Sequence, residues 1–309
     1  MRKNRLPLLL TITLLAVFAP LTQAYEQPSV NLGFTTFMDG GPPAGPGWYF
    51  QQYFQYWSAD KFTGSDGKTA IPAELEAVIS LSQLIYQSEK TFLGGTTGID
   101  FILPYVMLNL DPGPTPLREQ SGMGDFLVGP YIQWGPIMGE KGPIFMHRVE
   151  LQMVFPTGDY DRRYALNPGS NHFSFNPYWS GTLFMGSKWT ASTRIHLLIN
   201  EQNDSPAFIT GLKSFQAGTA VHGNFAISYE VTPRQLRIGL NGYFFEQIAD
   251  TKVDGHGNNS LDEQVFAIGP GMLYSFSPDN HIFLNYYMES GAENRPEGWR
   301  LNARWTHHF

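Results

Sequence analysis

Residues 215–230, FQAGTAVHGNFAISYE, decide the fold class of this chain. Within them Val221 and Ile227 alternate with His222 and Ser228, so apolar and polar side chains fall on opposite sides of an extended chain. A period of two residues is that of a β-strand with one apolar face. The same alternation recurs in 189–200, 234–247, 263–276, 281–289 and 299–309. The pattern predicts a chain that is nearly all β.

The predicted strands and their connections together indicate a closed barrel. About twelve strands are expected, within a range of ten to fourteen, near 47–59, 74–87, 97–109, 123–135, 143–155, 173–185, 187–200, 213–231, 234–248, 263–277, 280–289 and 297–309. Long links such as 156–172 alternate with short ones such as 186–188, and 290–297 is intermediate. Long loops on one rim and tight turns on the other are typical of antiparallel transmembrane β-barrels.

Two soluble folds share the alternation but fit less well. Strands of a β-sandwich are usually about five or six residues long, shorter than the segments found here. A lipocalin-type barrel buries its apolar face inside, so Arg194, His196, Glu230 and Arg237 would all point away from its interior. A transmembrane β-strand needs about 9–11 residues, which matches the predicted lengths.

Composition narrows the function classes. The 309-residue chain is 15% charged, has no cysteine, and has a mean hydropathy of −0.22. The low hydropathy excludes a helical membrane bundle, and the lack of cysteine excludes disulfide scaffolds, thiolate metal sites, cysteine nucleophiles and a lipoprotein anchor. The net charge of −7 without a basic patch argues against a nucleic-acid partner.

The two ends of the chain indicate export to the outer membrane. Arg2 and Arg5 precede an apolar stretch at 6–21, and Ala24 follows at a position suited to signal-peptide cleavage. An uncleaved anchor is less favoured, because the apolar stretch is shorter than the ~20 residues that a span requires. Cleavage after Ala24 gives three parts: a signal peptide at 1–24, a periplasmic or plug-like segment at 25–46, and the barrel at 47–309. Phe309 ends an alternating strand, as in the signal that the barrel-assembly machinery recognises.

Several blocks resemble one known family. They are 32–34 (LGF), 39–43 (DGGPP), 46–49 (PGWY), 56–62 (YWSADKF), 122–126 (GMGDF), 129–134 (GPYIQW), 155–161 (FPTGDYD), 166–171 (LNPGSN) and 175–178 (FNPY). Together they resemble the "meta-pathway of phenol degradation" proteins. The resemblance implies an outer-membrane barrel that is often encoded near aromatic catabolism, and it brings no reaction and no catalytic residues. Pro156 and Gly158 favour turns, so this block is either the ordered root of a loop over the pore mouth or a plain surface turn.

Two constellations of side chains suggest chemistry, each with a simpler alternative. His172 and Ser174 lie two residues apart with Asn176 beyond them, which suits a hydroxyl nucleophile and its base, or equally hydrogen bonds at the rim. His196 and His222 are expected on neighbouring strands, where they bind a ligand or metal or belong to an ordinary polar interior. Neither signal is specific, so the chain is not predicted to be an enzyme, and no metal or cofactor is predicted.

The predicted function follows from barrel size and lining. Eight strands leave an interior filled by side chains and sixteen leave a wide pore, so about twelve leave a narrow lumen. The predicted lining residues are polar or aromatic: Asp125, Tyr131, Arg148, Glu150, Arg194, His196, His222, Glu230, Arg237, Asn241, Tyr243, Arg300 and Arg304. Such a lining suits an outer-membrane channel for small molecules, including aromatic or hydrophobic ones, surrounded by lipid and lipopolysaccharide. The alternatives are an outer-membrane lipid hydrolase using Ser174 and His172, or a plugged structural or adhesive barrel.

Overall fold

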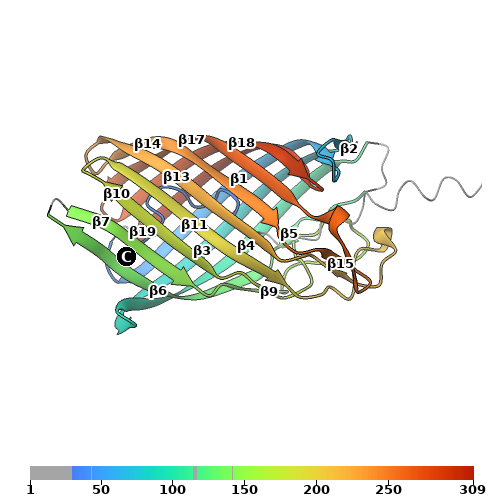
Figure 1. Cartoon of the computed structure of the whole chain (residues 1–309), viewed down its shortest axis with the longest axis horizontal. Helices are drawn as coiled ribbons and strands as arrows, with labels where there is room; N and C mark the ends of the chain where they lie inside the picture. The colour runs from blue at the N-terminus through green and yellow to red at the C-terminus, as the bar shows by residue number, and fades with distance from the viewer. Residues whose placement is uncertain (1–29, 43, 114–116, 141) are drawn as a thin grey trace, which may run out of the picture.

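The computed structural model describes residues 30–42, 44–113, 117–140 and 142–309, and Figure 1 shows a single barrel. The predicted signal peptide at 1–24 and residues 25–29 lie outside the described part. Twelve long strands form the wall: β1 (Gly47–Thr63), β3 (Glu74–Phe92), β4 (Gly95–Asp111), β6 (Phe126–Gly139), β7 (Gly142–Glu150), β10 (Tyr178–Met185), β11 (Trp189–Asn200), β13 (Ala220–Thr232), β14 (Leu236–Gln247), β17 (Gln264–Ser277), β18 (Asn280–Glu293) and β19 (Pro296–His308).

The smaller elements extend the wall or lie in the loops. β2 (Thr69–Ile71), β5 (Gly122–Met123), β8 (Met153–Phe155) and β9 (Ser174–Phe175) prolong the sheet at one rim. A separate three-stranded sheet joins β12 (Phe215–Gln216), β15 (Thr251–Val253) and β16 (His256–Asn258). The described helices are single 3-10 turns, η1 (Phe208–Thr210) and η2 (Asn259–Leu261). Among the described residues, no helix is long and apolar enough to cross a membrane.

The barrel is closed by its first and last strands. Each long strand pairs antiparallel with the next, and β19 pairs with β1, placing Tyr53 opposite Arg304 and Trp57 opposite Arg300. Closure leaves the wall without a free edge, which is how transmembrane barrels satisfy every backbone group. The prediction of about twelve antiparallel strands in a barrel is confirmed.

The two rims differ as the loop lengths predict, with two local corrections. Tight turns lie at the left of Figure 1 and the long connections at the right, and the C-terminus lies at the turn rim. The expected intermediate connection at 290–297 is wrong, because β18 and β19 are longer and only two residues, Asn294 and Arg295, separate them. The expected strand at 213–231 is also too long, since β13 begins at Ala220 and Phe215 belongs to the loop sheet.

The outer face of the wall has the character of a lipid-facing surface. Ile227 and Leu240 are exposed, while the alternating Ser228 and Asn241 are buried toward the interior. Trp299 and Trp305 face outward six residues apart on β19, a span of about 20 Å at 3.4 Å per residue. Aromatic residues near both ends of an apolar band are typical of outer-membrane barrels, whose band is about 25 Å tall.

Residues 30–42, here called the N-terminal strap, run inside the barrel. Leu32 packs against Tyr243 and Phe245, and Phe37 packs against Phe283. Three strap amides donate to wall side chains: Gly33 N to Asn224 Oδ1 at 2.7 Å, Met38 N to Ser192 Oγ at 3.0 Å, and Gly40 N to Thr182 Oγ1 at 2.8 Å. The strap has no regular secondary structure, so wall side chains supply the partners that its backbone needs.

Candidate functional site: a lumen of two chambers

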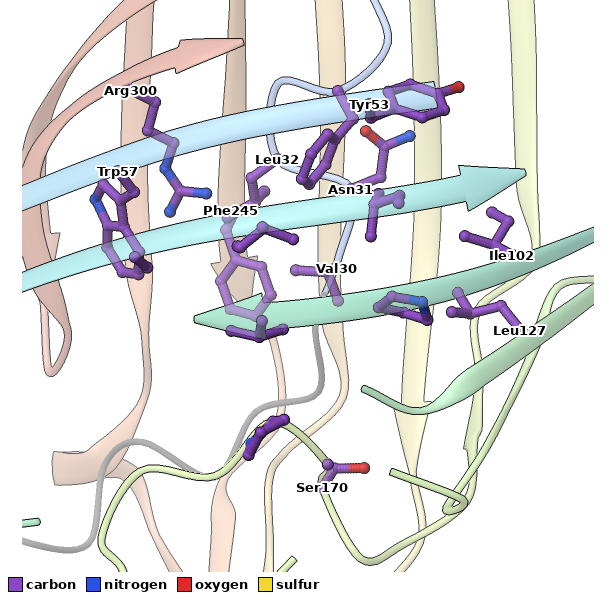
Figure 2. Close-up of a pocket in the computed structure, with 18 of the residues that line it drawn as sticks. Val30, Asn31, Leu32, Tyr53, Trp57, Ile102, Leu127, Ser170, Phe245 and Arg300 are labelled. Atoms are coloured by element: carbon purple, nitrogen blue, oxygen red, sulfur yellow. The ribbon is translucent and has the colours of Figure 1, made fainter. Parts of the chain in front are cut away.

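The half of the lumen nearest the long loops holds a small cavity, here called the apolar chamber. Its volume is about 140 Å³, and Figure 2 shows Ile102 and Leu127 on one side with Val30 and Leu32 of the strap nearby. The apolar wall of the chamber comes from three strands: Ile79 and Leu81 of β3, Ile102, Pro104 and Val106 of β4, and Leu127 of β6. An apolar cavity of about 150 Å³ holds a benzene molecule in another protein, so the chamber has room for one aromatic ring.

The sequence explains why this wall is apolar on both faces. The lumen-facing residues of β4, such as Ile102 and Val106, alternate with Leu103 and Met107, which are exposed outward. Transmembrane strands normally alternate apolar-out and polar-in. Apolar residues on both faces of β4 therefore make this side of the chamber apolar, while Gln152, Glu263, Arg295 and Arg300 also line the cavity.

The 151–177 connection forms the roof of the chamber. Its residues Pro168, Gly169 and Ser170 line the cavity, and Leu166 packs in the cluster that contains Trp57. The loop that starts with the 155–161 block therefore folds inward at 166–170, whereas Phe155, Pro156, Thr157 and Asp159 of the block itself are exposed.

Asp125 fixes the roof. Its Oδ1 accepts from Gly158 N at 2.9 Å, and its Oδ2 accepts from Ser170 N at 2.8 Å and from the Ser170 hydroxyl. Gly158 and Gly169 are in backbone contact: a Cβ on Gly158 would lie 2.8 Å from the Gly169 Cα. Asp125 thus ties two segments of the loop to the barrel and does not line the open lumen.

The half of the lumen nearest the tight turns is a larger, positively charged space, here called the arginine vestibule. Its volume is about 740 Å³. Five arginines line it, and two carboxylates oppose them: Arg148, Arg194, Arg234, Arg237 and Arg304 against Asp39 and Glu230. Aromatic side chains lie beside several of these cations, with the Arg148 guanidinium 4.0 Å from the Tyr131 ring centre and that of Arg194 4.0 Å from Tyr178.

Four residues line both chambers and so form the constriction between them: Thr35, Tyr53, Gln83 and Arg194. The Tyr53 hydroxyl donates to Gln83 Oε1 at 2.9 Å, which holds two of the four together. Arg194 donates to both oxygens of Asp39 on the strap, at 2.7 and 2.8 Å. The strap is therefore part of the constriction, held there by a buried bidentate ion pair.

Most of the predicted lining residues lie inside the barrel, where many of them contact other side chains of the wall. Tyr243 and Arg300 both bind Glu289, and the Tyr178 hydroxyl donates to Glu150. His196 and His222 stack with ring centres 4.3 Å apart, and Arg237 lies 3.7 Å from Glu230 near the turn rim. Asn241 is buried. The predicted residues thus form a polar wall of the lumen rather than one compact binding site.

Gly129 leaves room for two carboxyl groups in the lumen, those of Glu150 and Asp100. Glu150 and Asp100 lie on β7 and β4, on either side of β6, and Gly129 of β6 lies between them. A Cβ on Gly129 would lie 2.2 Å from Glu150 Oε1 and 2.7 Å from Asp100 Oδ1. Any larger residue would push the two carboxyl groups apart, so the position requires glycine.

The proposed hydrolase pair is not assembled. The Ser174 hydroxyl donates to Asn200 Oδ1 at 2.7 Å, and His172 Nδ1 lies 2.8 Å from the Ser170 carbonyl oxygen. Among the hydrogen bonds of the described residues none joins Ser174 to His172, and both side chains are buried inside the loop rim. Burial lowers the pKa of His172.

Within the described residues, no group of three or more histidine, aspartate or glutamate side chains could hold a metal ion.

The apolar wall was not predicted, because the predicted lumen lining consisted of polar and aromatic residues. Ile79, Leu81 and Ile102 carry a signal that could have identified them. The segments 77–87 and 99–110 are apolar on both faces rather than on one. Two apolar faces are expected when both sides of a strand meet apolar surroundings.

The closed wall, the two rims and the occupied lumen define a twelve-stranded β-barrel of the outer-membrane type. The sequence matches the family described as "Putative MetA-pathway of phenol degradation" over residues 59–305, and the chain belongs to this family. The resemblance seen in the sequence is thereby confirmed. A comparison with the curated proteins found no match.

The chain is similar to several solved structures. The COG4313 outer membrane channel from Pseudomonas putida F1 is 17% identical, with a TM-score of 0.78 over 91% of this chain and 100% of that chain. The β domain of the Bordetella autotransporter BrkA is 12% identical, with a TM-score of 0.49 over 86% of this chain and 100% of that chain. The KdgM porin is 10% identical, with a TM-score of 0.42 over 84% and 99%. The first of these shows the fold, and the last two scores are too low to carry an argument.

Proposed function

We propose that the chain is a bacterial outer-membrane channel that admits small molecules carrying an aromatic or other apolar ring. The observation that carries the proposal is the apolar chamber, which has the volume of one ring and lies in line with the arginine vestibule. Family membership and the channel named in the Pseudomonas structure support the same function. The unassembled Ser174 and His172 give no support to hydrolysis.

The apolar wall favours binding of an aromatic ring. Burying an aromatic side chain contributes about 1.5–3 kcal/mol, and a free ring against Ile79, Ile102 and Leu127 gains a comparable transfer free energy. A polar molecule of the same size gains no such transfer free energy against this wall and loses hydrogen bonds to water on that side. The apolar wall therefore favours small molecules with an apolar ring over polar molecules of the same size.

The setting of the channel is part of the proposal. The outward apolar band would face lipid and lipopolysaccharide, with the tight turns toward the periplasm. Phe309 is 72% exposed at the turn rim, where its backbone N–H donates to Trp48 O at 3.0 Å. The barrel-assembly machinery would recognise this C-terminal residue. The signal peptide would direct export and would be cleaved after Ala24.

A planar-bilayer recording of the refolded mature chain tests the proposal. We expect a steady conductance that phenol reduces with saturation and that glycerol at the same concentration leaves unchanged. No conductance from protein that migrates as a folded, heat-modifiable barrel would overturn the channel and favour a plugged structural barrel. A current insensitive to phenol would overturn the selection for rings.

A further inference from the structure

We propose that the arginine vestibule contains a binding site for an aromatic carboxylate, centred on Arg304. This inference rests on the proposed channel function and names a class of substrate for it. It starts from the pairing of the lumen arginines with carboxylates.

Four lumen arginines have carboxylate partners within 4 Å: Arg194 with Asp39, Arg237 with Glu230, Arg295 with Glu263, and Arg300 with Glu289. Among the described residues, Arg148, Arg234 and Arg304 have none within that distance, and Arg234 is exposed at the turn rim. Arg148 Nε does donate to the Gln133 side-chain oxygen at 3.0 Å. Arg304 is therefore a better candidate than Arg148 for the residue that binds an external anion.

Arg304 is buried and incompletely bonded. It is 7% exposed, its Nε has no hydrogen-bond partner among the described residues, and it lines the vestibule. A buried guanidinium group without a counter-ion is costly, and a carboxylate is the ligand whose two oxygens match its planar donors. The incomplete bonding thus points to an anion with that geometry.

Aromatic rings flank the same cation. The Arg304 guanidinium lies 3.6 Å from the ring centre of Phe283 and 5.7 Å from that of Tyr53, which face it from the two neighbouring strands. Tyr53 is also one of the four constriction residues. A molecule whose carboxylate binds Arg304 would have an aromatic surface beside it and the apolar chamber beyond the constriction.

The charge of the vestibule agrees with an anionic ligand. Its lining has five arginines and two carboxylates, an excess of three positive charges. Asp39 shows how an internal anion uses this lining, since its carboxylate binds Arg194 through both oxygens. An aromatic acid would bind Arg304 in the same bidentate geometry, because no carboxylate of the described strap residues pairs with Arg304.

The test uses the refolded mature chain in planar bilayers with benzoate as the probe and benzyl alcohol as its neutral counterpart. We expect benzoate to interrupt the current at a concentration about tenfold or more below that of benzyl alcohol. In Arg304→Met this advantage disappears, and in Arg304→Lys it is reduced but retained. Arg234→Met is the matched control, because it removes one charge from the exposed part of the same vestibule.

The outcomes separate this inference from the proposed function. Equal block by benzoate and benzyl alcohol, or equal effects of Arg304→Met and Arg234→Met, would overturn the Arg304 site while phenol block still supported the channel. If the protein did not conduct, calorimetric titration of benzoate into the detergent-solubilised barrel would decide the site independently. Heat-modifiable migration establishes that each variant is folded.

Discussion

The two walls of the lumen face the same space but have opposite chemistry. The wall formed by β10, β11 and β13 offers Thr182, Ser192 and Asn224, and the strap is hydrogen-bonded to it. The wall formed by β3, β4 and β6 is apolar and faces an open chamber. A strap without its own secondary structure needs a wall that satisfies its backbone, because an unpaired buried amide costs about 1–3 kcal/mol. The polar wall therefore binds the strap, and the apolar wall is left open to a ligand.

Asp39→Asn should have the largest effect, because it breaks the buried ion pair that holds the strap to the polar wall. Removing one partner of such a pair costs about 3–5 kcal/mol. We expect residues 30–42 to exchange their amide protons faster and the single-channel conductance to rise severalfold. Asp66→Asn is the control, since Asp66 pairs with Lys68 at an exposed loop. Unchanged exchange and conductance in Asp39→Asn would mean that the strap does not depend on Arg194.

The double variant Ile79→Asn with Leu81→Asn removes much of the contrast between the walls. The lost ring contact is worth about 1.5–3 kcal/mol, so we expect the half-blocking concentration of phenol to rise about tenfold or more. Exchanging the two residues, Ile79→Leu with Leu81→Ile, keeps the apolar volume and should change the value less than threefold. Equal values for both variants would show that phenol does not use the apolar wall.

Asp125→Asn should loosen the roof without touching either wall. The amide can still accept from Gly158 N but cannot accept from both groups of Ser170 at the position of Oδ2. The loss should be about 1–3 kcal/mol, measured as faster proteolysis of the 156–172 loop in the intact barrel. Asp111→Asn, at the end of β4, should leave the proteolysis rate as it is.

Acidification should produce the smallest change, again at the roof. Burial lowers the pKa of His172, so the folded loop binds fewer protons than the unfolded loop. The stabilising contribution is complete above about pH 6.5 and declines as the pH falls below that value. Loop proteolysis at pH 5 should therefore exceed that at pH 7.5, and His172→Gln should remove the difference. His256→Gln, in an exposed loop, should retain it.

The barrel could be predicted from the sequence, because apolar side chains at every second residue indicate which face of a strand contacts lipid. Val221 to Tyr229 shows this directly, with His222 and Asn224 turned inward. The apolar chamber could not be predicted from the sequence. Ile79 and Ile102 lie on strands with two apolar faces, where alternation does not indicate which face points into the lumen. The bonding of the predicted lining residues also depends on register between distant strands, as in the contact of Glu289 with Arg300.

Crystallographic localisation of 4-bromophenol in the wild-type barrel tests most directly whether the apolar wall binds the ring. The account predicts an anomalous bromine peak inside the apolar chamber, beside Ile79, Ile102 and Leu127. Bromine found only on the lipid-facing surface or outside the barrel, with the chamber empty at saturating ligand, would contradict it.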